Sequence, residues 1–162
     1  SRQVYNLVFY HLQNREETEE VTQDVFLKVI AKASSFNFKS KFETWMYRLA
    51  VNEALDRIRY NQRKKRKVEK VPLQNLIFTR DHSQRTPSEI LQSEESQSKV
   101  LAAIEDLPQN QKTALLLNKM EGKSQKEVAE ILDISPKAVE SLIQRAKSGL
   151  RERLKDYFET KF

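Results

Sequence analysis

Apolar residues recur at a helical spacing along most of this chain, and the pattern therefore predicts helices. Over residues 4–32 the period indicates two helices separated at Asn14–Glu17, and a longer helix follows from Phe42 to about Gln62. From about Lys99 onward helical patterns return on both sides of Pro108. Only two glycines and four prolines occur in 162 residues, which is too few turn residues for a sheet-rich fold, so the predicted fold class is all-α.

Residues 71–97 differ from the rest of the chain. They are polar and rich in Ser and Gln, contain Pro72 and Pro87, and have little periodicity before the Ser-Glu-Ile-Leu stretch. We interpret this segment as a flexible linker between two small helical domains. The predicted limits are 1–67 for the N-terminal domain, 68–97 for the linker and 98–162 for the C-terminal domain. Position 1 is not Met, and we expect residues to be missing upstream.

The C-terminal domain contains two short helical patterns broken by four residues, Asp-Ile-Ser-Pro at 133–136. Ser124 and Glu127 form an S-x-x-E capping box for the first helix, and Ser135 followed by Pro136 suits the start of the second. A break this tight holds the second helix at a fixed angle, as in a helix-turn-helix that presents its second helix to DNA. Tight corners also occur in helical bundles that bind no DNA.

The second of these helices has an apolar stripe and an opposite polar face. That face carries side chains of the kind that read purines or contact phosphates: Lys137, Ser141, Gln144 and Arg145. The pattern favours DNA binding but does not specify the class of regulator.

The helix predicted from Phe42 is apolar on two sides, which leaves a narrow polar lane of Arg48, Asn52, Asp56 and Arg59. The lane fits either a specific role or an exposed strip of weak ion pairs. The preceding loop, residues 36–41, combines two Phe with Lys and Asn side chains. This composition suits stacking on unpaired bases, and it equally suits packing of the rings into a core.

Basic residues concentrate in residues 57–70, where eight Lys or Arg and one acid produce a local charge of +7, against +6 for the whole chain. Nucleic acid is the natural partner, since neutralised phosphates release counterions, and a solvated basic tail is the alternative. Glu20, Gln23 and Asp24 share one face of the second helix. A carboxylate-rich face suits a basic protein surface, although many such faces are only solvated.

Composition also excludes several classes of protein. The chain has no cysteine, which rules out a disulfide framework and Cys-based zinc sites and fits a reducing cytoplasm. His11 and His82 are the only histidines, and neither a Gly-rich phosphate loop nor a metal-ligand spacing is present. We therefore expect no catalytic residue, metal or cofactor. No apolar run approaches the roughly 18 residues of a membrane span, and no membrane insertion is expected.

Three blocks of the sequence resemble the extracytoplasmic-function (ECF) type of bacterial RNA polymerase sigma factors. The first, EEVTQDVFLKVIAK, is similar to the polymerase-binding helix of that family, and FETWMYRLAVNEALDRIR is similar to its −10-recognition helix. The stretch from Leu107 to Leu154 is similar to its −35-binding domain. The order and spacing of the blocks make the resemblance specific.

The resemblance implies roles for residues already singled out. The residues expected to contact the −10 element are Phe36, Asn37, Phe38, Lys39, Trp45, Arg48, Asn52 and Asp56. The residues expected at the −35 element are Lys137, Ser141, Gln144 and Arg145. The residues expected to bind core polymerase are Glu20, Gln23 and Asp24.

The resemblance also implies partners. A factor of this type binds the clamp of the largest polymerase subunit and the flap of the second-largest, and it directs promoter recognition and melting without enzymatic activity. Its location is cytoplasmic, and because many such factors are held by a membrane-linked anti-sigma factor, we expect an anti-sigma factor as a further partner. Three positions depart from the family pattern: Lys119 replaces a frequent aromatic, Glu140 a usual basic residue and Leu142 a frequent Arg. A helix-turn-helix regulator that binds operator DNA without polymerase, and an RNA-binding protein that uses the basic run, are the alternatives.

Overall fold

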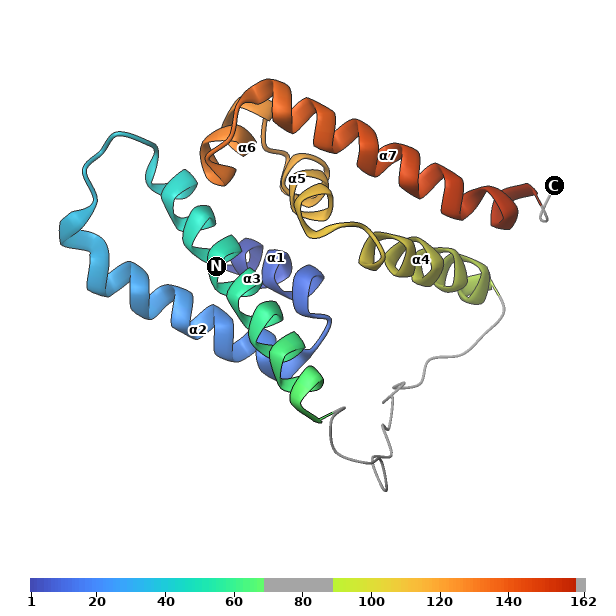
Figure 1. Ribbon diagram of the computed structural model, residues 1–162, viewed down its shortest axis with the longest axis horizontal. Helices are drawn as coiled ribbons and strands as arrows, with labels where there is room; N and C mark the ends of the chain where they lie inside the picture. Colours follow the sequence, from blue (N-terminus) through green and yellow to red (C-terminus); the bar gives the residue numbers. More distant parts are fainter. Residues whose placement is uncertain (69–88, 160–162) are drawn as a thin grey trace.

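The computed structural model describes residues 1–68 and 89–159, so most of the predicted linker lies outside the described residues. The described residues form helices, as predicted (Figure 1). In chain order these are α1 (Arg2–Leu12), α2 (Arg15–Lys32), the 3-10 helix η1 (Ala33–Ser35), α3 (Phe42–Val68), α4 (Glu89–Glu105), α5 (Gln109–Lys119), α6 (Gln125–Leu132) and α7 (Pro136–Glu159).

The first unit consists of α1, α2 and α3 packed against one another (Figure 1). A break between α1 and α2 is present as predicted, but it lies at Gln13 and Asn14, because residues 15–17 already belong to α2. Gln13 ends α1 with a left-handed φ of 50°, and the side chain of Asn14 accepts a hydrogen bond from the Glu17 amide (3.0 Å). The third helix extends past its predicted end near Gln62 to Val68, so most of the basic run is helical.

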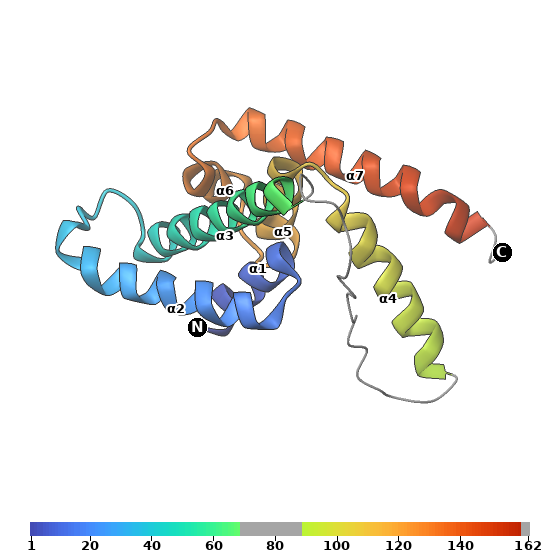
Figure 2. The ribbon, with the colours of Figure 1, turned by 60° about the horizontal axis from the view of Figure 1, so that its bottom comes forward.

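The second unit contains α4 to α7. Helix α4 begins at Glu89, within the segment predicted as linker, and runs beside the C-terminal half of α7, away from the first unit (Figure 1 and Figure 2). The helix-turn-helix expectation is met by α6 and α7. The Ser124 hydroxyl accepts from the Glu127 amide (3.2 Å), and the Glu127 carboxylate accepts from the Ser124 amide (2.9 Å). Ser135 then caps α7 by accepting from the Ala138 amide (3.1 Å).

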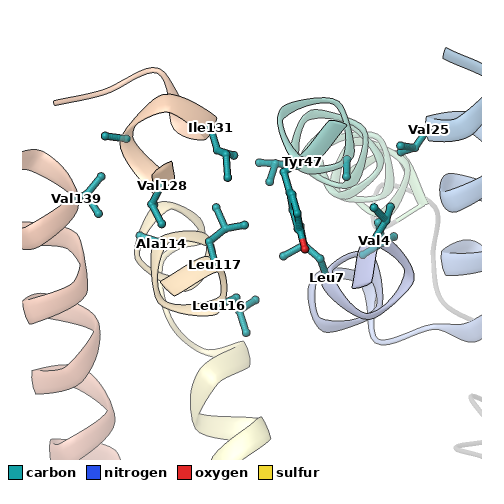
Figure 3. Packing of buried hydrophobic residues seen from close by; sticks show 14 of the residues in the cluster. Val4, Leu7, Val25, Tyr47, Ala114, Leu116, Leu117, Val128, Ile131 and Val139 are labelled. Carbon is teal, nitrogen blue, oxygen red and sulfur yellow. The ribbon is translucent and has the colours of Figure 1, made fainter. Parts of the chain in front are cut away.

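The two units share one hydrophobic core, which the sequence did not indicate. Tyr47 of α3 is fully buried at the junction, and Figure 3 shows it with Leu7 on one side and Leu117 and Ile131 on the other. The Tyr47 hydroxyl donates to Glu121 (2.7 Å). Burial, followed by this hydrogen bond, raises the pKa of the phenol. Contacts of α1 with α5 and of α3 with α6 continue the junction.

A second polar contact crosses the junction between α1 and α5. The Thr113 hydroxyl donates to the Gln109 carbonyl (2.8 Å), so it accepts from the imidazole Nε2–H of His11 (2.9 Å). His11 is buried, as is the neighbouring Lys112. Burial, and secondarily the charge of Lys112, lowers the pKa of His11 to about 4. A neutral imidazole is therefore part of the packed junction.

None of the helices in the described residues is long and apolar enough to cross a membrane.

The lowered pKa of His11 predicts acid-dependent stability. Between its ordinary pKa of 6.5 and about 4, the unfolded chain binds more protons here than the folded chain. The stabilisation from this group is therefore fully present above pH 6.5 and is lost as the pH falls from 6.5 towards 4, by at most about 3 kcal/mol. Urea denaturation at several pH values measures the loss.

The matched control is His11→Gln, whose amide can still donate to Thr113 but does not titrate. We expect this variant to lose less stability than the native chain over the same pH range. Equal losses would contradict the assignment to His11.

Candidate nucleic-acid interface

The loop between η1 and α3 is built around a cluster of aromatic rings. Phe36 lies at its centre, with ring-centroid distances of 5.2 Å to Trp45 and 5.8 Å to Phe42. Phe38 touches only one edge of the cluster in the described residues, 4.8 Å from Phe36, and is 85% exposed. The loop therefore packs the ring of Phe36 into the cluster and leaves the ring of Phe38 exposed to solvent.

The conformation of the loop tip is locally enforced. Phe38 has a left-handed φ of 57°, and the Asn37 side chain accepts from the Lys39 amide (3.2 Å), forming an Asx-turn around it. Beside the tip is a cavity of about 410 Å³ with both ring and polar walls. Its lining residues are Ser35, Phe36, Asn37, Lys39, Ser40, Trp45, Arg48 and Glu130.

The polar lane of α3 only partly faces solvent. Asn52 and Asp56 are exposed, and Asp56 pairs with Arg59 (2.9 Å), as in the ion-pair interpretation of the lane. Arg48 is partly buried, and its guanidinium donates to the main-chain carbonyl of Glu130 in α6. The structure thus brings Arg48 together with the second unit and leaves Asn52 and Asp56 accessible.

A basic groove follows the lane toward the C-terminal end of α3. It has a volume of about 410 Å³ and is lined by Asp56, Arg59, Gln62, Arg63 and Arg66. The three arginines of this groove were absent from the predicted site residues, although the charge of residues 57–70 had indicated them. Because α3 continues as a helix to Val68, these arginines lie along one groove.

The polar face of α7 is exposed as predicted. Lys137, Ser141, Gln144 and Arg145 all lie on it, opposite the buried Val139. The turn before α7 places Asp133 at a left-handed φ of 56°. These four side chains form one surface at the N-terminal half of the helix, where a helix-turn-helix contacts base edges.

The polar faces of α3 and α7 meet at one cavity of about 650 Å³ between the two units. Arg48 and Asn52 of α3 line one wall, and Ser141 and Arg145 of α7 line the other. Gln144 and Lys137 are not among the lining residues. Two groups of candidate residues more than 80 positions apart thus face each other.

The outer face of α2 is more apolar than the sequence had indicated. Gln23 and Asp24 are exposed, whereas Glu20 accepts a hydrogen bond from Arg57 of α3 (2.9 Å). On this helix Leu27 is 63% exposed and Ile30 is 73% exposed. Leu27 and Ile30 lie outside the helical stripe of the buried Val21 and Val25, so helical spacing by itself indicates that they face outward.

The described residues contain no group of three or more His, Asp or Glu side chains that could hold a metal ion.

Comparisons with known sequences match both units. Residues 1–64 match the Sigma-70 region 2 family, and residues 97–150 match the Sigma-70, region 4 family. The chain is 29% identical to the ECF RNA polymerase sigma factor SigW of Bacillus subtilis, over 94% of this chain and 83% of that protein. It is also 29% identical to the ECF RNA polymerase sigma-E factor of Haemophilus influenzae, over 94% and 88% of the two chains.

The fold is similar to two solved structures. One is the sigma factor RpoE in complex with the anti-sigma factor NepR from Bartonella quintana, with a TM-score of 0.70 and 23% identity over 94% of this chain and 89% of that one. The other is CnrH in complex with the cytosolic domain of CnrY, with a TM-score of 0.66 and 19% identity over 95% and 81%.

The different positions of Phe36 and Phe38 in the aromatic loop predict different effects when each ring is removed. Phe36→Ala removes the central ring, and we expect it to destabilise the first unit by about 2 kcal/mol, below the value for a fully buried Phe because Phe36 is only half-buried. Phe38→Ala removes an exposed ring and should change stability by less than about 0.5 kcal/mol. Urea denaturation followed by circular dichroism compares the two; similar losses would contradict the packing described.

Proposed function

This chain belongs to the sigma-70 family as an ECF-type sigma factor that directs RNA polymerase to promoters, and from this premise we propose which of its surfaces perform each step. The first unit corresponds to region 2 and the second to region 4. As a sigma factor the chain is non-enzymatic. One observation carries the proposal. The first unit has an exposed aromatic loop beside the polar lane of α3, and the second unit has a helix-turn-helix whose outer face is polar.

The loop at residues 36–39 is proposed to hold an unpaired base of the −10 element. An exposed ring at position 38 offers a stacking surface, and the cavity beside it supplies an amide and an amine to the base edge and the phosphate. The Asx-turn and the ring of Phe36 fix the loop before DNA arrives, so little ordering entropy is lost on binding. In this assignment Trp45 supports the loop.

The lane and groove of α3 are proposed to follow the same DNA strand. Asn52 and Asp56 are exposed where they can reach base edges, and the arginines of the groove lie where phosphates of the adjoining duplex would pass. Since the basic run is helical up to Val68, its charges form a continuous track.

The exposed face of α7 is proposed to read the −35 element in the major groove. Gln144 suits adenine, Lys137 and Arg145 suit guanine or phosphate, and Ser141 suits either. Glu140 is also exposed on α7, and its negative charge weakens the attraction to phosphate next to the reading face. Polymerase would hold the two units at a set separation, which raises the effective concentration of the second reader once the first has bound.

The outer face of α2 is proposed to dock on the clamp of the largest polymerase subunit. It combines the carboxylates of Asp24 and Glu20 with the exposed apolar pair Leu27 and Ile30. Apolar residues framed by charge are typical of a protein interface, and a negative face here would be repelled by DNA. The second unit is proposed to engage the flap of the second-largest subunit.

An anti-sigma factor is a further proposed partner, and with it a cytoplasmic location. The support is the fold similarity to RpoE bound to NepR and to CnrH bound to the cytosolic domain of CnrY.

Transcription in vitro tests the DNA assignments. Purified chain added to core polymerase should start RNA at selected promoters, and Asn52→Ala and Gln144→Ala should each lower the yield by about 5- to 100-fold, the effect of losing one base contact. The control is Gln97→Ala, which truncates an exposed Gln on α4. Tight operator binding without core, and no core-dependent RNA, would instead support a repressor.

Binding to core polymerase tests the docking face independently of DNA. Leu27→Ala and Ile30→Ala together should weaken the affinity for core by at least about tenfold, because interface anchors of this size contribute 1 kcal/mol or more each, as an approximate value. The control, Tyr60→Ala, truncates a large exposed side chain on α3 that is 56% exposed, and it should leave the affinity for core polymerase unchanged. Fluorescence anisotropy with labelled chain measures the affinity of each variant for core polymerase. Equal losses of affinity in the α2 double variant and in the control would exclude the outer face of α2 as the docking surface.

A further inference from the structure

Glu140 is an acidic side chain on the face of α7 that is proposed to read the −35 element. It is exposed, and so are Lys137 before it and Gln144 after it. Residues three and four positions apart are neighbours on a helix surface, so these three side chains lie in one row. A duplex that contacts Lys137 and Gln144 therefore also meets the carboxylate of Glu140.

The local structure gives the carboxylate of Glu140 no other partner. Among the described residues it forms neither an ion pair nor a hydrogen bond, although Lys137 is its neighbour on the helix. Helix α7 begins at Pro136, so Glu140 lies beyond the first turn, in which the helix dipole stabilises a negative charge. Ser135 already caps this end of the helix. Neither capping nor ion pairing therefore accounts for an acid at this position.

An acid on this face is unfavourable in DNA unless a base edge offers it a hydrogen-bond donor, because the phosphates repel it. In the major groove guanine presents only acceptors, and thymine presents an acceptor and a methyl group. Cytosine presents the N4 amino group, which donates. Adenine also presents an amino group, but its N7 acceptor lies beside it and repels the second carboxylate oxygen. Cytosine is therefore the base that a single carboxylate matches best.

The same side of α7 supplies attraction to phosphate further along the helix. Lys147 and Arg151 follow Glu140 at i+7 and i+11, spacings that keep side chains on one side of a helix. Both are exposed, and neither forms an ion pair with another described residue. Phosphate contacts from these two cations can hold the helix on the duplex while the residues of its N-terminal half select bases.

We propose that Glu140 is a specificity-determining residue: its carboxylate accepts a hydrogen bond from the N4 amino group of a cytosine in the −35 element and rejects guanine and thymine at that position. The proposal rests on the assignment of the outer face of α7 to the −35 element. One helical turn advances about 5.4 Å and one base pair about 3.4 Å. The cytosine therefore lies within about two base pairs of the base that Gln144 reads.

Selection from a randomised −35 element tests the proposal with the complete holoenzyme. Core polymerase carrying the native chain or Glu140→Ala binds promoter fragments, and sequencing of the bound fragments gives the base preference at each position. The native chain should prefer cytosine, on one strand, to guanine or thymine at one position by about 5- to 100-fold, and Glu140→Ala should lose this preference. Fragments with guanine or thymine there should bind Glu140→Ala more tightly than the native chain, a gain that misfolding cannot produce.

Two further variants give matched comparisons. Glu140→Gln keeps the size of the side chain, and because Gln pairs with N6 and N7 of adenine, we expect adenine to become the preferred base at the same position. Glu152→Ala removes another exposed acid of α7, beyond the N-terminal half of the helix, and should keep every native preference. An unchanged preference for cytosine in Glu140→Ala, or loss of the same preference in Glu152→Ala, would overturn the proposal.

Gln144→Ala separates this inference from the function on which it rests. If the native holoenzyme selects no sequence in the −35 element, the proposed function fails and the inference falls with it. If Gln144→Ala removes the preference at one position while Glu140→Ala removes none, α7 reads the −35 element and Glu140 does not select a base.

Discussion

Burial of Tyr47 is the interaction on which this structure depends. The ring is contributed by α3, yet it is enclosed by residues of α1 and of the second unit, including Leu7 and Leu117 (Figure 3). Its hydroxyl meets Glu121, so the polar atom carried into the core is satisfied. A unit of three helices buries little apolar surface by itself, and a shared core adds burial that neither unit has alone.

The same junction is part apolar and part polar. Its rim includes ion pairs such as Lys123 with Glu43, whose side chains are 12% and 46% exposed, and the exposed partner limits the net free energy that such a pair contributes. Contacts of this kind can be exchanged for contacts with a larger partner. An interface inside one chain that is part apolar and part polar is suited to opening and closing.

Local rules accounted for much of the fold. The capping box at Ser124 and Glu127, the cap at Ser135 and the break at Asn14 depend only on neighbouring residues, and each is present as expected. The linker prediction was less accurate at its C-terminal end, because α4 begins at Glu89 within it. That part of α4 is polar, and its helical period was too weak to distinguish it from a loop.

The sequence by itself determined that the chain is helical, that two units carry sigma-type blocks, and which helices have a polar face, because capping and periodicity act over three or four residues. Only the tertiary structure decided which side chains of those faces contact another helix and which are exposed. The Arg48 contact with the Glu130 carbonyl, the Glu20 pair with Arg57, and the exposure of Leu27 and Ile30 all depend on how helices pack. Spacing along one helix cannot specify a contact that is made or withheld by another helix far away in the chain.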